Sequence, residues 1–329
     1  MLRKTSFWWA PVLVWAMVVP AGAADLKKGV IDPKEAGPDF AVQGEYAGEV
    51  RADQGPVKIG VQIIALGDGK FHTVGYQGGL PGDGWDGGQR GEGDGQTKDG
   101  VTTITGRDSP VKATIKDGVL TVIGAEGKTL GTLKKVERKS PTLGQKPPAG
   151  AVVLFDGKTA ENFKGGRMTD DGLLMEGATS KQAFPSFTMH MEFLLPFMPY
   201  ARGQARGNSG FYAQGRYEVQ ILDSFGLSGE SNECGGIYGV SKPAVNMCLP
   251  PLSWQTYDVD YTAAEYKDGK KVKNARMTVR HNGVLIQDNV EIPHGTTAAP
   301  LREGPETGPV FLQNHGNPVR FRNIWVVVK

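Results

Sequence analysis

Apolar and polar residues alternate with a period of two over short runs along most of the chain. Such alternation is typical of half-buried β-strands. Between positions 43 and 138 the runs include VKIGVQIIAL, KFHTVGY, VTTITG and VLTVIG, and Asp99-Gly100 and Asp117-Gly118 mark turns between some of them. We therefore predict a small antiparallel β-domain of unassigned role, a barrel or a sandwich, over residues 43–138.

The alternation returns after position 151 and continues to the C-terminus. Its runs include FTMHMEFLLPF, YEVQILD, TYDVDYTA, ARMTVRHNGVLI and VRFRNIWVVV, and no long segment with helical periodicity competes with them. Many strands with long connections over residues 152–329 predict a two-sheet β-sandwich of jelly-roll type. The fold class is thus all-β, and the Pro-rich segment 139–151, KSPTLGQKPPAGA, is predicted to link the two domains.

The first 23 residues contain a single apolar stretch and do not alternate. Arg3 and Lys4 precede the apolar stretch Phe7 to Val19, and Ala21-Gly22-Ala23 follows. This order is typical of a cleaved secretory signal peptide. We predict a signal peptide over residues 1–23, a polar leader arm over 24–42, and an exported protein with no stable membrane span after cleavage. An uncleaved anchor is the alternative.

Composition and net charge limit the classes of molecule that the protein is expected to bind. The chain has 47 glycines and 21 prolines, which suits a turn-rich β protein. It has 37 basic and 35 acidic residues, and removal of Arg3 and Lys4 leaves 35 of each. A balanced mature chain has no electrostatic signature of nucleic-acid or membrane binding.

The chain has two cysteines, Cys234 and Cys248. Because export permits disulfides and the intervening loop is short, we predict that the two are bonded to each other. Two buried free thiols are the alternative. A metal pair is a weaker reading, because no histidine or third cysteine stands at ligand spacing.

The segment GRYEVQILDSF raises the question of a functional cleft. Glu218 and Gln220 share one face of its predicted strand, and the other face carries Tyr217, Val219 and Ile221. The apolar face is expected to bury against a second sheet. A regular strand would turn Asp223 away from Glu218, but a β-bulge at Leu222–Asp223 would bring it back. We expect the bulge and a shared cleft; a solvated outer face is the alternative.

The C-terminal segment GPVFLQNHGNPVRFRNIW offers a second set of polar groups. Gln313 and His315 alternate with apolar neighbours, and Arg322 follows the turn at Gly316-Asn317-Pro318. Each has a structural alternative, which for Arg322 is an ion pair that holds the fold. Asn208 is a candidate to bind polar groups of a ligand or to satisfy loop backbone, and Tyr238 is a candidate to stack on a ligand ring.

An ordered set of motifs gives the chain a family resemblance. LFDGKTAENF, EFLLPF, NSGFYAQGRYEVQILDSF, GGIYGV, SWQTYDVDY, HNGVLI and GPVFLQNHGNPVRFRNIWV together resemble the 3-keto-disaccharide hydrolase domain family, common in secreted bacterial proteins. The resemblance covers residues 152–329 and implies a concanavalin A-like fold with a concave sugar-binding face. It also implies a periplasmic or extracellular location in a bacterium.

The resemblance implies cleavage of 3-keto-glycosides. Laminarinase-like members of the superfamily use Glu-x-Asp-x-x-Glu, whereas this chain has Glu-x-Gln-x-x-Asp from Glu218 to Asp223. Because Gln220 cannot ionise, double displacement is disfavoured and elimination across C1 and C2 followed by hydration is preferred. Glu218 is then the candidate base and His315 or Asp223 the acid.

The sequence also offers candidate substrate-binding residues, and it leaves two alternative functions open. The remaining candidates are substrate-binding residues: Asn208, Gln220, Tyr238, Gln313 and Arg322, with Arg322 or a divalent metal at the ketone. A metal held by Glu218, Asp223 and His315 is one option. The expected partner is a carbohydrate or 3-keto-glycoside. A non-catalytic lectin-like module and an envelope interaction protein are the alternatives, because this fold also hosts lectins.

Overall fold

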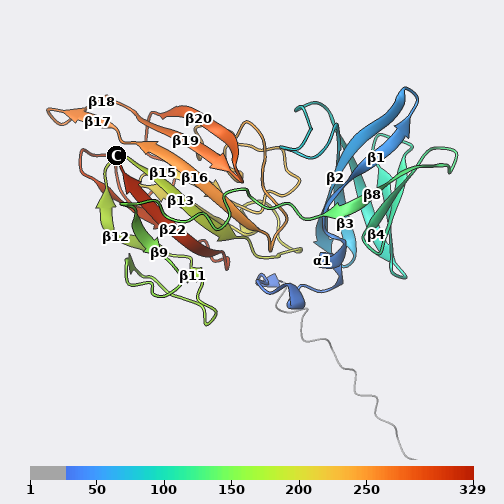
Figure 1. Cartoon of the computed structure of the whole chain (residues 1–329), viewed down its shortest axis with the longest axis horizontal. Coiled ribbons are helices and arrows are strands. Elements are labelled where there is room, and N and C mark those ends of the chain that lie inside the picture. Colours follow the sequence, from blue (N-terminus) through green and yellow to red (C-terminus); the bar gives the residue numbers. More distant parts are fainter. Residues whose placement is uncertain (1–26) are drawn as a thin grey trace, which may run out of the picture.

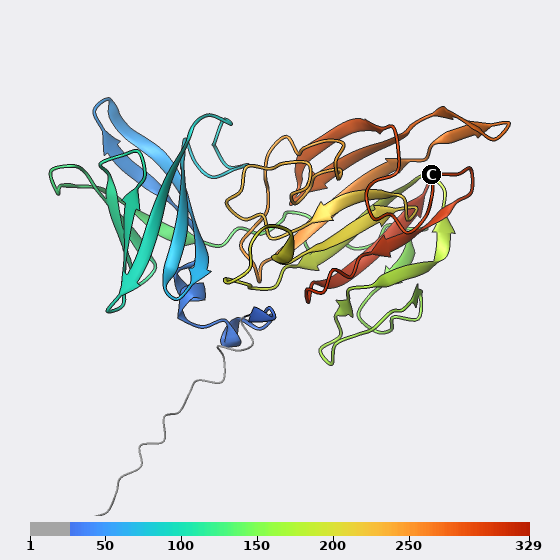
Figure 2. The same ribbon diagram turned by 180° about the vertical axis from the view of Figure 1, so that it is seen from behind.

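The structure is a computed structural model that describes residues 27–329. The predicted signal peptide, residues 1–23, lies outside the described residues. Two bodies of antiparallel strands lie side by side, one formed by the first part of the chain and the other by the second (Figures 1 and 2). The predicted all-β class is confirmed.

The first body is a closed eight-stranded barrel in which each strand pairs with the next and β8 returns to β1. Closure leaves no free strand edge, which removes the main aggregation hazard of an isolated sheet. Its strands are β1 (Gly44–Ala52), β2 (Gly55–Gly67), β3 (Lys70–Gln77), β4 (Arg90–Lys98), β5 (Val101–Gly106), β6 (Lys112–Lys116), β7 (Val119–Ile123) and β8 (Thr129–Val136).

The arm before the barrel packs on one of its ends. It contains a 3-10 helix, η2 (Pro33–Glu35), and a short helix, α1 (Pro38–Val42). Phe40 of α1 meets Phe197 of the second body edge to face, with ring centroids 5.5 Å apart. Val30 forms an isolated β-bridge with the same Phe197. Residues 30–42 of the predicted leader arm are therefore packed against the barrel and the second body.

The second body contains two antiparallel sheets that face each other across one apolar core. The five-stranded sheet has the order β10-β12-β21-β14-β15, and the larger sheet has the order β11-β22-β13-β16-β19-β20 with β9 beside β22. A small hairpin, β17–β18, extends from it (Figure 1). The five-stranded sheet comprises β10 (Phe163–Lys164), β12 (Ala178–Phe184), β14 (Ser209–Ala213), β15 (Tyr217–Ile221) and β21 (Gly308–Leu312).

The larger sheet and the hairpin account for the other strands. They are β9 (Val152–Phe155), β11 (Leu174–Met175), β13 (Phe187–Leu194), β16 (Trp254–Thr262), β17 (Glu265–Lys267), β18 (Lys270–Lys273), β19 (Ala275–His281), β20 (Val284–Ile292) and β22 (Arg320–Val328). A 3-10 helix, η3 (Gly203–Ala205), precedes β14. Among residues 27–329 no helix has the length and apolarity needed to cross a membrane.

The alternation of β15 divides its side chains between core and outer face. Tyr217, Val219 and Ile221 are buried in the core between the sheets, as their apolar side chains require. Glu218 and Gln220 therefore point away from that core. This arrangement places the polar pair of the strand on the outer face of the five-stranded sheet.

Cys234 and Cys248 are free thiols in this core, which corrects the predicted disulfide. Both are buried, and the Cys248 thiol donates to the Leu222 carbonyl oxygen at 3.6 Å. The sulfur of Cys234 also lies 3.2 Å from the Tyr257 hydroxyl oxygen. The two residues thus behave as small apolar side chains that fill the core, the alternative reading of the pair.

The segment that links the bodies is bound along the outer face of the larger sheet, which it crosses in front in Figure 1. The Ser140 hydroxyl lies 2.6 Å from that of Thr256, and the Thr142 hydroxyl donates to Asp258 at 2.7 Å. The Gly144 amide donates to Glu192 at 2.6 Å. Residues 140–145 therefore form a fixed strap rather than a loose linker.

Glu192 is the main anchor of this strap. Burial raises the pKa of its carboxyl, but hydrogen bonds from His190, Asn323, Arg322 and the Gly144 amide outweigh burial and lower it to about 2. The contribution of Glu192 to stability is therefore complete above pH 4.5 and is lost as the pH falls toward 2.

Glu192→Gln should release the strap. The substitution removes the charge that these donors share, and we expect a loss of about 2–4 kcal/mol in the free energy of unfolding. Trypsin should then cut faster after the exposed Lys139, which directly precedes Ser140 of the strap, and a time course on gels would measure the rate. Unchanged cleavage in the variant would show that Glu192 does not hold the strap.

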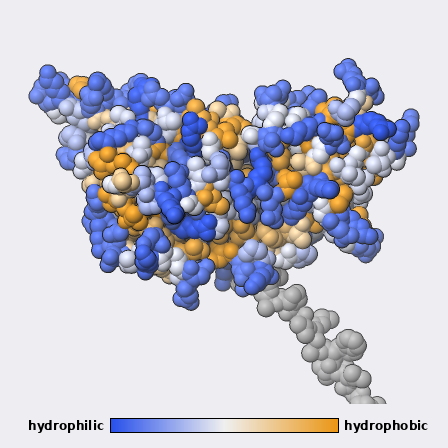
Figure 3. All heavy atoms as spheres, in the orientation of Figure 1, coloured by the Kyte–Doolittle hydropathy of each residue, from blue (hydrophilic) through white to orange (hydrophobic). Residues whose placement is uncertain are grey.

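The barrel and the sandwich share an apolar contact. Ile64, Val74 and Tyr76 on the outside of the barrel belong to the same core cluster as the sandwich interior. Arg206 of the sandwich donates to the Ala65 carbonyl oxygen of β2 at 3.2 Å. On the face seen in Figure 3, hydrophilic and hydrophobic residues are interspersed over both bodies.

Candidate functional site

A pocket of about 140 Å³ opens on the outer face of the five-stranded sheet, at its β15 edge. Its volume is below the ~300 Å³ of pockets for drug-sized ligands and fits a compact group such as one sugar ring. Six predicted site residues line it together. The lining residues are Gln204, Asn208, Tyr212, Glu218, Gln220, Tyr238, Thr297, Ala298, Gln313 and His315.

Glu218 lies beneath this pocket because the strand register places it there. It pairs with Tyr212 directly across the β14–β15 hairpin. Gly210 lies two positions before Tyr212 on the same face, and a Cβ added to it would be 2.2 Å from Glu218 Oε1. The absence of a side chain at Gly210 therefore provides the space in which the carboxyl sits.

The Glu218 carboxyl is buried, with 2% of the residue exposed, and forms no ion pair with a basic side chain of residues 27–329. Burial raises its pKa to about 8, and a hydrogen bond with the Tyr212 hydroxyl opposes the shift only in part. The carboxyl can therefore hold or release a proton near neutral pH, as a general base or acid must.

Tyr212 and Gln313 form a polar wall beside this carboxyl. The Gln313 side-chain amide donates to the Tyr212 hydroxyl oxygen at 3.0 Å, and that hydroxyl lies 3.3 Å from the Thr297 carbonyl oxygen. Burial and the nearby Glu218 raise the pKa of Tyr212. The phenol therefore stays protonated and remains a hydrogen-bond donor in the pocket.

Two side-chain carbonyl oxygens in the pocket have no hydrogen-bond partner among residues 27–329. The amide nitrogens of Asn208 and Gln220 both donate to Gln204 Oε1, at 3.0 Å and 3.1 Å. This bonding fixes the orientation of both amides and leaves Asn208 Oδ1 and Gln220 Oε1 buried and unpaired. Because unpaired buried acceptors are costly, they are ready to receive ligand hydroxyl donors.

The rim of the pocket is formed by more exposed groups. Tyr238 is half-buried, and its backbone amide donates to the Glu218 carbonyl oxygen at 3.1 Å. His315 is exposed and follows β21. An aromatic ring and an imidazole thus flank the entrance, where an outer portion of a ligand would lie.

Asp223 does not share this pocket, which corrects its predicted role. Strand β15 ends at Ile221, and the Asp223 carboxylate accepts a hydrogen bond from Arg206 Nε. Arg206 in turn contacts the barrel, so this ion pair stabilises the junction of the two bodies. The expected bulge does not bring Asp223 to Glu218.

Arg322 also lies outside the pocket that Glu218 lines. It lies on β22 of the other sheet, where it donates to Glu192 at 2.7 Å and its guanidinium stacks 3.9 Å from the Trp254 ring centroid. These contacts match the alternative of an ion pair that holds the fold. The ketone-side role of Arg322 is therefore wrong, because the sandwich separates this residue from the pocket.

The predicted metal ligands are not gathered in one place. Asp223 is bound to Arg206, away from Glu218 and His315, which line the pocket. Within residues 27–329, no three His, Cys, Asp or Glu side chains form a group that could hold a metal ion. The triad of Glu218, Asp223 and His315 is therefore not formed.

Sequence reasoning missed Tyr212 and Gln204. The hairpin signal Gln214-Gly215 between two alternating runs would have placed Tyr212 opposite Glu218, as the observed register does. Gln204 precedes β14 in an irregular segment. No periodic pattern connects such a segment to a strand face, so its contact with Gln220 depends on tertiary structure.

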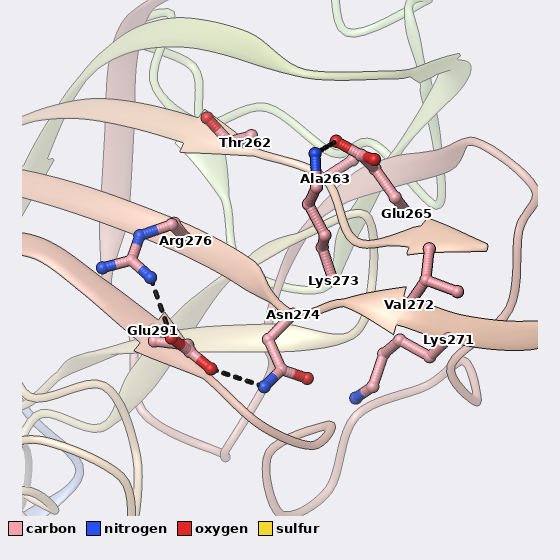
Figure 4. A pocket seen from close by; sticks show the side chains of 9 residues that line it. All are labelled: Thr262, Ala263, Glu265, Lys271, Val272, Lys273, Asn274, Arg276 and Glu291. Carbon is pink, nitrogen blue, oxygen red and sulfur yellow. Dashed lines mark hydrogen bonds and ion pairs between the residues drawn. The ribbon is translucent and has the colours of Figure 1, made fainter.

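A larger hollow at the β17–β18 hairpin is a weaker candidate (Figure 4). Its charged side chains bind one another: Lys273 with Glu265, and Arg276 with Glu291, both at 2.9 Å. Lys271 pairs with Glu303 at 2.9 Å. These ion pairs leave the hollow without a free charged group for chemistry.

Gly210→Ala should test the placement of the Glu218 carboxyl. The added Cβ would lie 2.2 Å from Glu218 Oε1 and 2.9 Å from the Tyr212 ring, and the atoms nearest to it would all be side-chain atoms, so we expect these two side chains to shift while the fold is retained. Catalysis should fall about 100-fold, since a misplacement of about 1 Å can have this effect. Activity assays would measure the loss of catalysis, and thermal melts would measure stability. Full activity in the variant would contradict the position assigned to the Glu218 carboxyl.

Two solved structures match a little over half of the chain. A candidate glycosyl hydrolase from Parabacteroides distasonis is 34% identical, covers 55% of this chain and 85% of its own, and has a TM-score of 0.51. A second one from the same organism is 20% identical, covers 54% and 93%, and has a TM-score of 0.39. A comparison with curated protein sequences finds no match.

A family model described as the 3-keto-alpha-glucoside-1,2-lyase-like domain matches residues 150–327. The match begins just before β9 and ends at residue 327, one residue before the end of β22. It includes every residue that lines the pocket. Because it spans more than half of the 329 residues, the chain belongs to the family of 3-keto-alpha-glucoside-1,2-lyase-like domains.

Proposed function

We propose that the protein cleaves glycosides that carry a ketone at C3, by elimination between C1 and C2 followed by addition of water. The buried Glu218 carboxyl carries this proposal, because its pKa of about 8 suits proton transfer and it has no cationic partner. The family description, a 1,2-lyase-like domain acting on 3-keto-α-glucosides, supports the same substrate class.

The reaction begins with proton abstraction from C2. The C3 ketone makes this proton acidic, because the electron pair left on C2 delocalises onto the ketone oxygen. Glu218 in its carboxylate form removes the proton and becomes a neutral acid. A base with a pKa near the working pH is well matched to this step, whereas an exposed glutamate would be too weak.

The Tyr212 hydroxyl is the proposed donor to the enolate oxygen. It remains protonated next to the base, and Gln313 holds it in place at 3.0 Å. A donor fixed before the reaction stabilises negative charge as it develops. The unpaired oxygens of Asn208 and Gln220 accept hydroxyl protons of the same ring and orient it.

The leaving group departs at the rim of the pocket. As the C1–O bond breaks, the electron pair on C2 forms the C1–C2 double bond, and His315 supplies the proton that the departing oxygen takes up. Water then adds its oxygen to C1 and passes one proton to His315, which replaces the proton that His315 gave to the leaving group, while protonated Glu218 returns a proton to C2. The products are the free 3-keto sugar and the released alcohol or sugar, and Glu218 is again a carboxylate.

The finer fold and the location are part of the proposal. The two facing sheets agree with a concanavalin A-like jelly roll, in which the outer face of the five-stranded sheet would be the sugar-binding face. The basic and apolar N-terminus supports export to the periplasm or beyond. The ligand is thus a carbohydrate met outside the cytoplasm.

Matched disaccharides test this function. The purified protein is incubated with a disaccharide oxidised at C3 and with its unoxidised parent, and released sugar is measured by chromatography. We expect release only from the oxidised substrate, because the parent has no acidic C2–H. Equal release from both would contradict the elimination. Binding of the oxidised sugar without release would favour the lectin-like alternative.

A further inference from the structure

The barrel holds an apolar pocket of about 310 Å³ that none of the sandwich chemistry uses. All eight strands contribute to its wall, so it is the interior of the barrel and not a surface groove. One lining residue from each strand in turn is Val50, Ile59, Gly75, Gly91, Ile104, Ala113, Val122 and Leu130.

Glycines create this space. Strand β4 pairs with β3 through Gly75↔Gly91, and Gly93 follows on the same inward face. A Cβ added to Gly91 would meet no atom within 4 Å, and one at Gly75 would meet only the Gly91 carbonyl oxygen at 3.8 Å. Larger residues would fit at both positions, so the room is present because the sequence leaves it unfilled.

The two ends of the barrel differ. At the α1 end, Tyr46, Ile63 and Phe71 pack with Phe197 of the sandwich and with the arm before β1. At the other end, Val50, Ile59 and several similar side chains line the pocket and remain only half-buried. One end is therefore plugged, and the other presents an apolar interior to solvent.

We propose that the barrel binds a compact, uncharged and largely apolar molecule in this pocket, in the manner of a small-ligand carrier. The interior of an eight-stranded barrel has room for one small ligand, whereas a docking helix is about 10 Å wide with its side chains. The volume also lies within the range of small-molecule sites.

Charge and hydrogen bonding support a neutral ligand. Of the two charged residues beside the pocket, Glu92 is paired with Arg107 at 2.9 Å and Lys112 is exposed at the rim. Thr73 also lines the pocket, and its buried hydroxyl has no hydrogen-bond partner in the described part of the chain, residues 27–329. A single hydroxyl or carbonyl on the ligand would match this one polar group.

The test uses the neutral fluorescent probe N-phenyl-1-naphthylamine with the full-length protein. We expect saturable fluorescence enhancement at one site, reversed by decanol and not by glucose. Gly91→Leu should fill the pocket and abolish the enhancement. Thr103→Leu places the same side chain on the exposed outer face of β5 and should bind as the wild type does.

Other results would overturn the proposal. These are an absence of saturable enhancement with the wild type, or equal enhancement with a folded Gly91→Leu variant. A Gly91→Leu protein that fails to fold is replaced by Gly91→Val, to which the same criteria apply. Glu218→Gln should bind the probe normally, so loss of binding in that variant would place the probe in the sandwich pocket and contradict the barrel site.

Discussion

Glu218→Gln should abolish cleavage of 3-keto-glycosides while the protein stays folded. The substitution keeps the size of the side chain and removes its ability to take the C2 proton. General-base catalysis contributes about 10²–10⁴-fold, and we expect a loss toward the upper end because the pocket contains no second carboxylate. Steady-state assays on the oxidised disaccharide, with circular dichroism of the same samples, would measure the loss.

Asp223→Asn is the matched control. It makes the same chemical change five positions along the chain, where the carboxylate holds Arg206 and not a ligand. Arg206 would lose its buried partner, so we expect a loss of about 3 kcal/mol in the free energy of unfolding with kcat retained. If a folded Asp223→Asn protein were as inactive as Glu218→Gln, Asp223 would have to take part in catalysis.

The second large expected effect is on stability: the buried Glu218 carboxyl should make the folded protein less stable as the pH rises. The Glu218 pKa rises from 4.5 to about 8 in the folded protein, so between these values the folded state holds a proton that the unfolded state has lost. Stability must therefore fall as the pH rises from 4.5 to 8. With about 1.4 kcal/mol for each unit of pKa difference, the decrease reaches up to about 5 kcal/mol.

Glu218→Gln should remove this penalty. The variant should melt at the wild-type temperature near pH 4.5 and several degrees higher at pH 8, where the buried carboxylate destabilises the wild type. Thermal unfolding at a series of pH values would measure the difference. Parallel curves for the two proteins would show that the Glu218 pKa is not raised, and would remove the main physical reason to call it a base.

The strands were predictable because alternation reflects burial directly. Tyr217, Val219 and Ile221 had to face the core, and this requirement alone turned Glu218 and Gln220 outward. Closure of the first eight strands into a barrel was one of two stated options, since the alternation within each strand is the same in a barrel and a sandwich. The inward glycines of β4, Gly91 and Gly93, also alternate with polar residues, but they supply no apolar side chain, so the run lacks the apolar–polar alternation by which the other strands were predicted.

The site was predictable only where strand geometry determines neighbours. The β21 pattern brought Gln313 and His315 to the pocket of Glu218, but Arg322 belongs to the opposite sheet, which spacing along the chain does not reveal. The predicted place of Asp223 depended on a bulge, but β15 ends at Ile221 and Arg206 from the segment before β14 binds the Asp223 carboxylate. Contacts between irregular segments are decided by tertiary packing.

The most direct test of the central claim follows hydrogen at C2. The oxidised disaccharide is cleaved in D₂O, and the released 3-keto sugar is analysed by NMR at early times against a blank without protein. Proton removal by Glu218 and return from an exchangeable acid predict deuterium at C2 with the wild type, and neither cleavage nor exchange above the blank with Glu218→Gln. Cleavage that leaves the original hydrogen at C2 and is equally fast with Glu218→Gln would contradict removal of the C2 proton by Glu218.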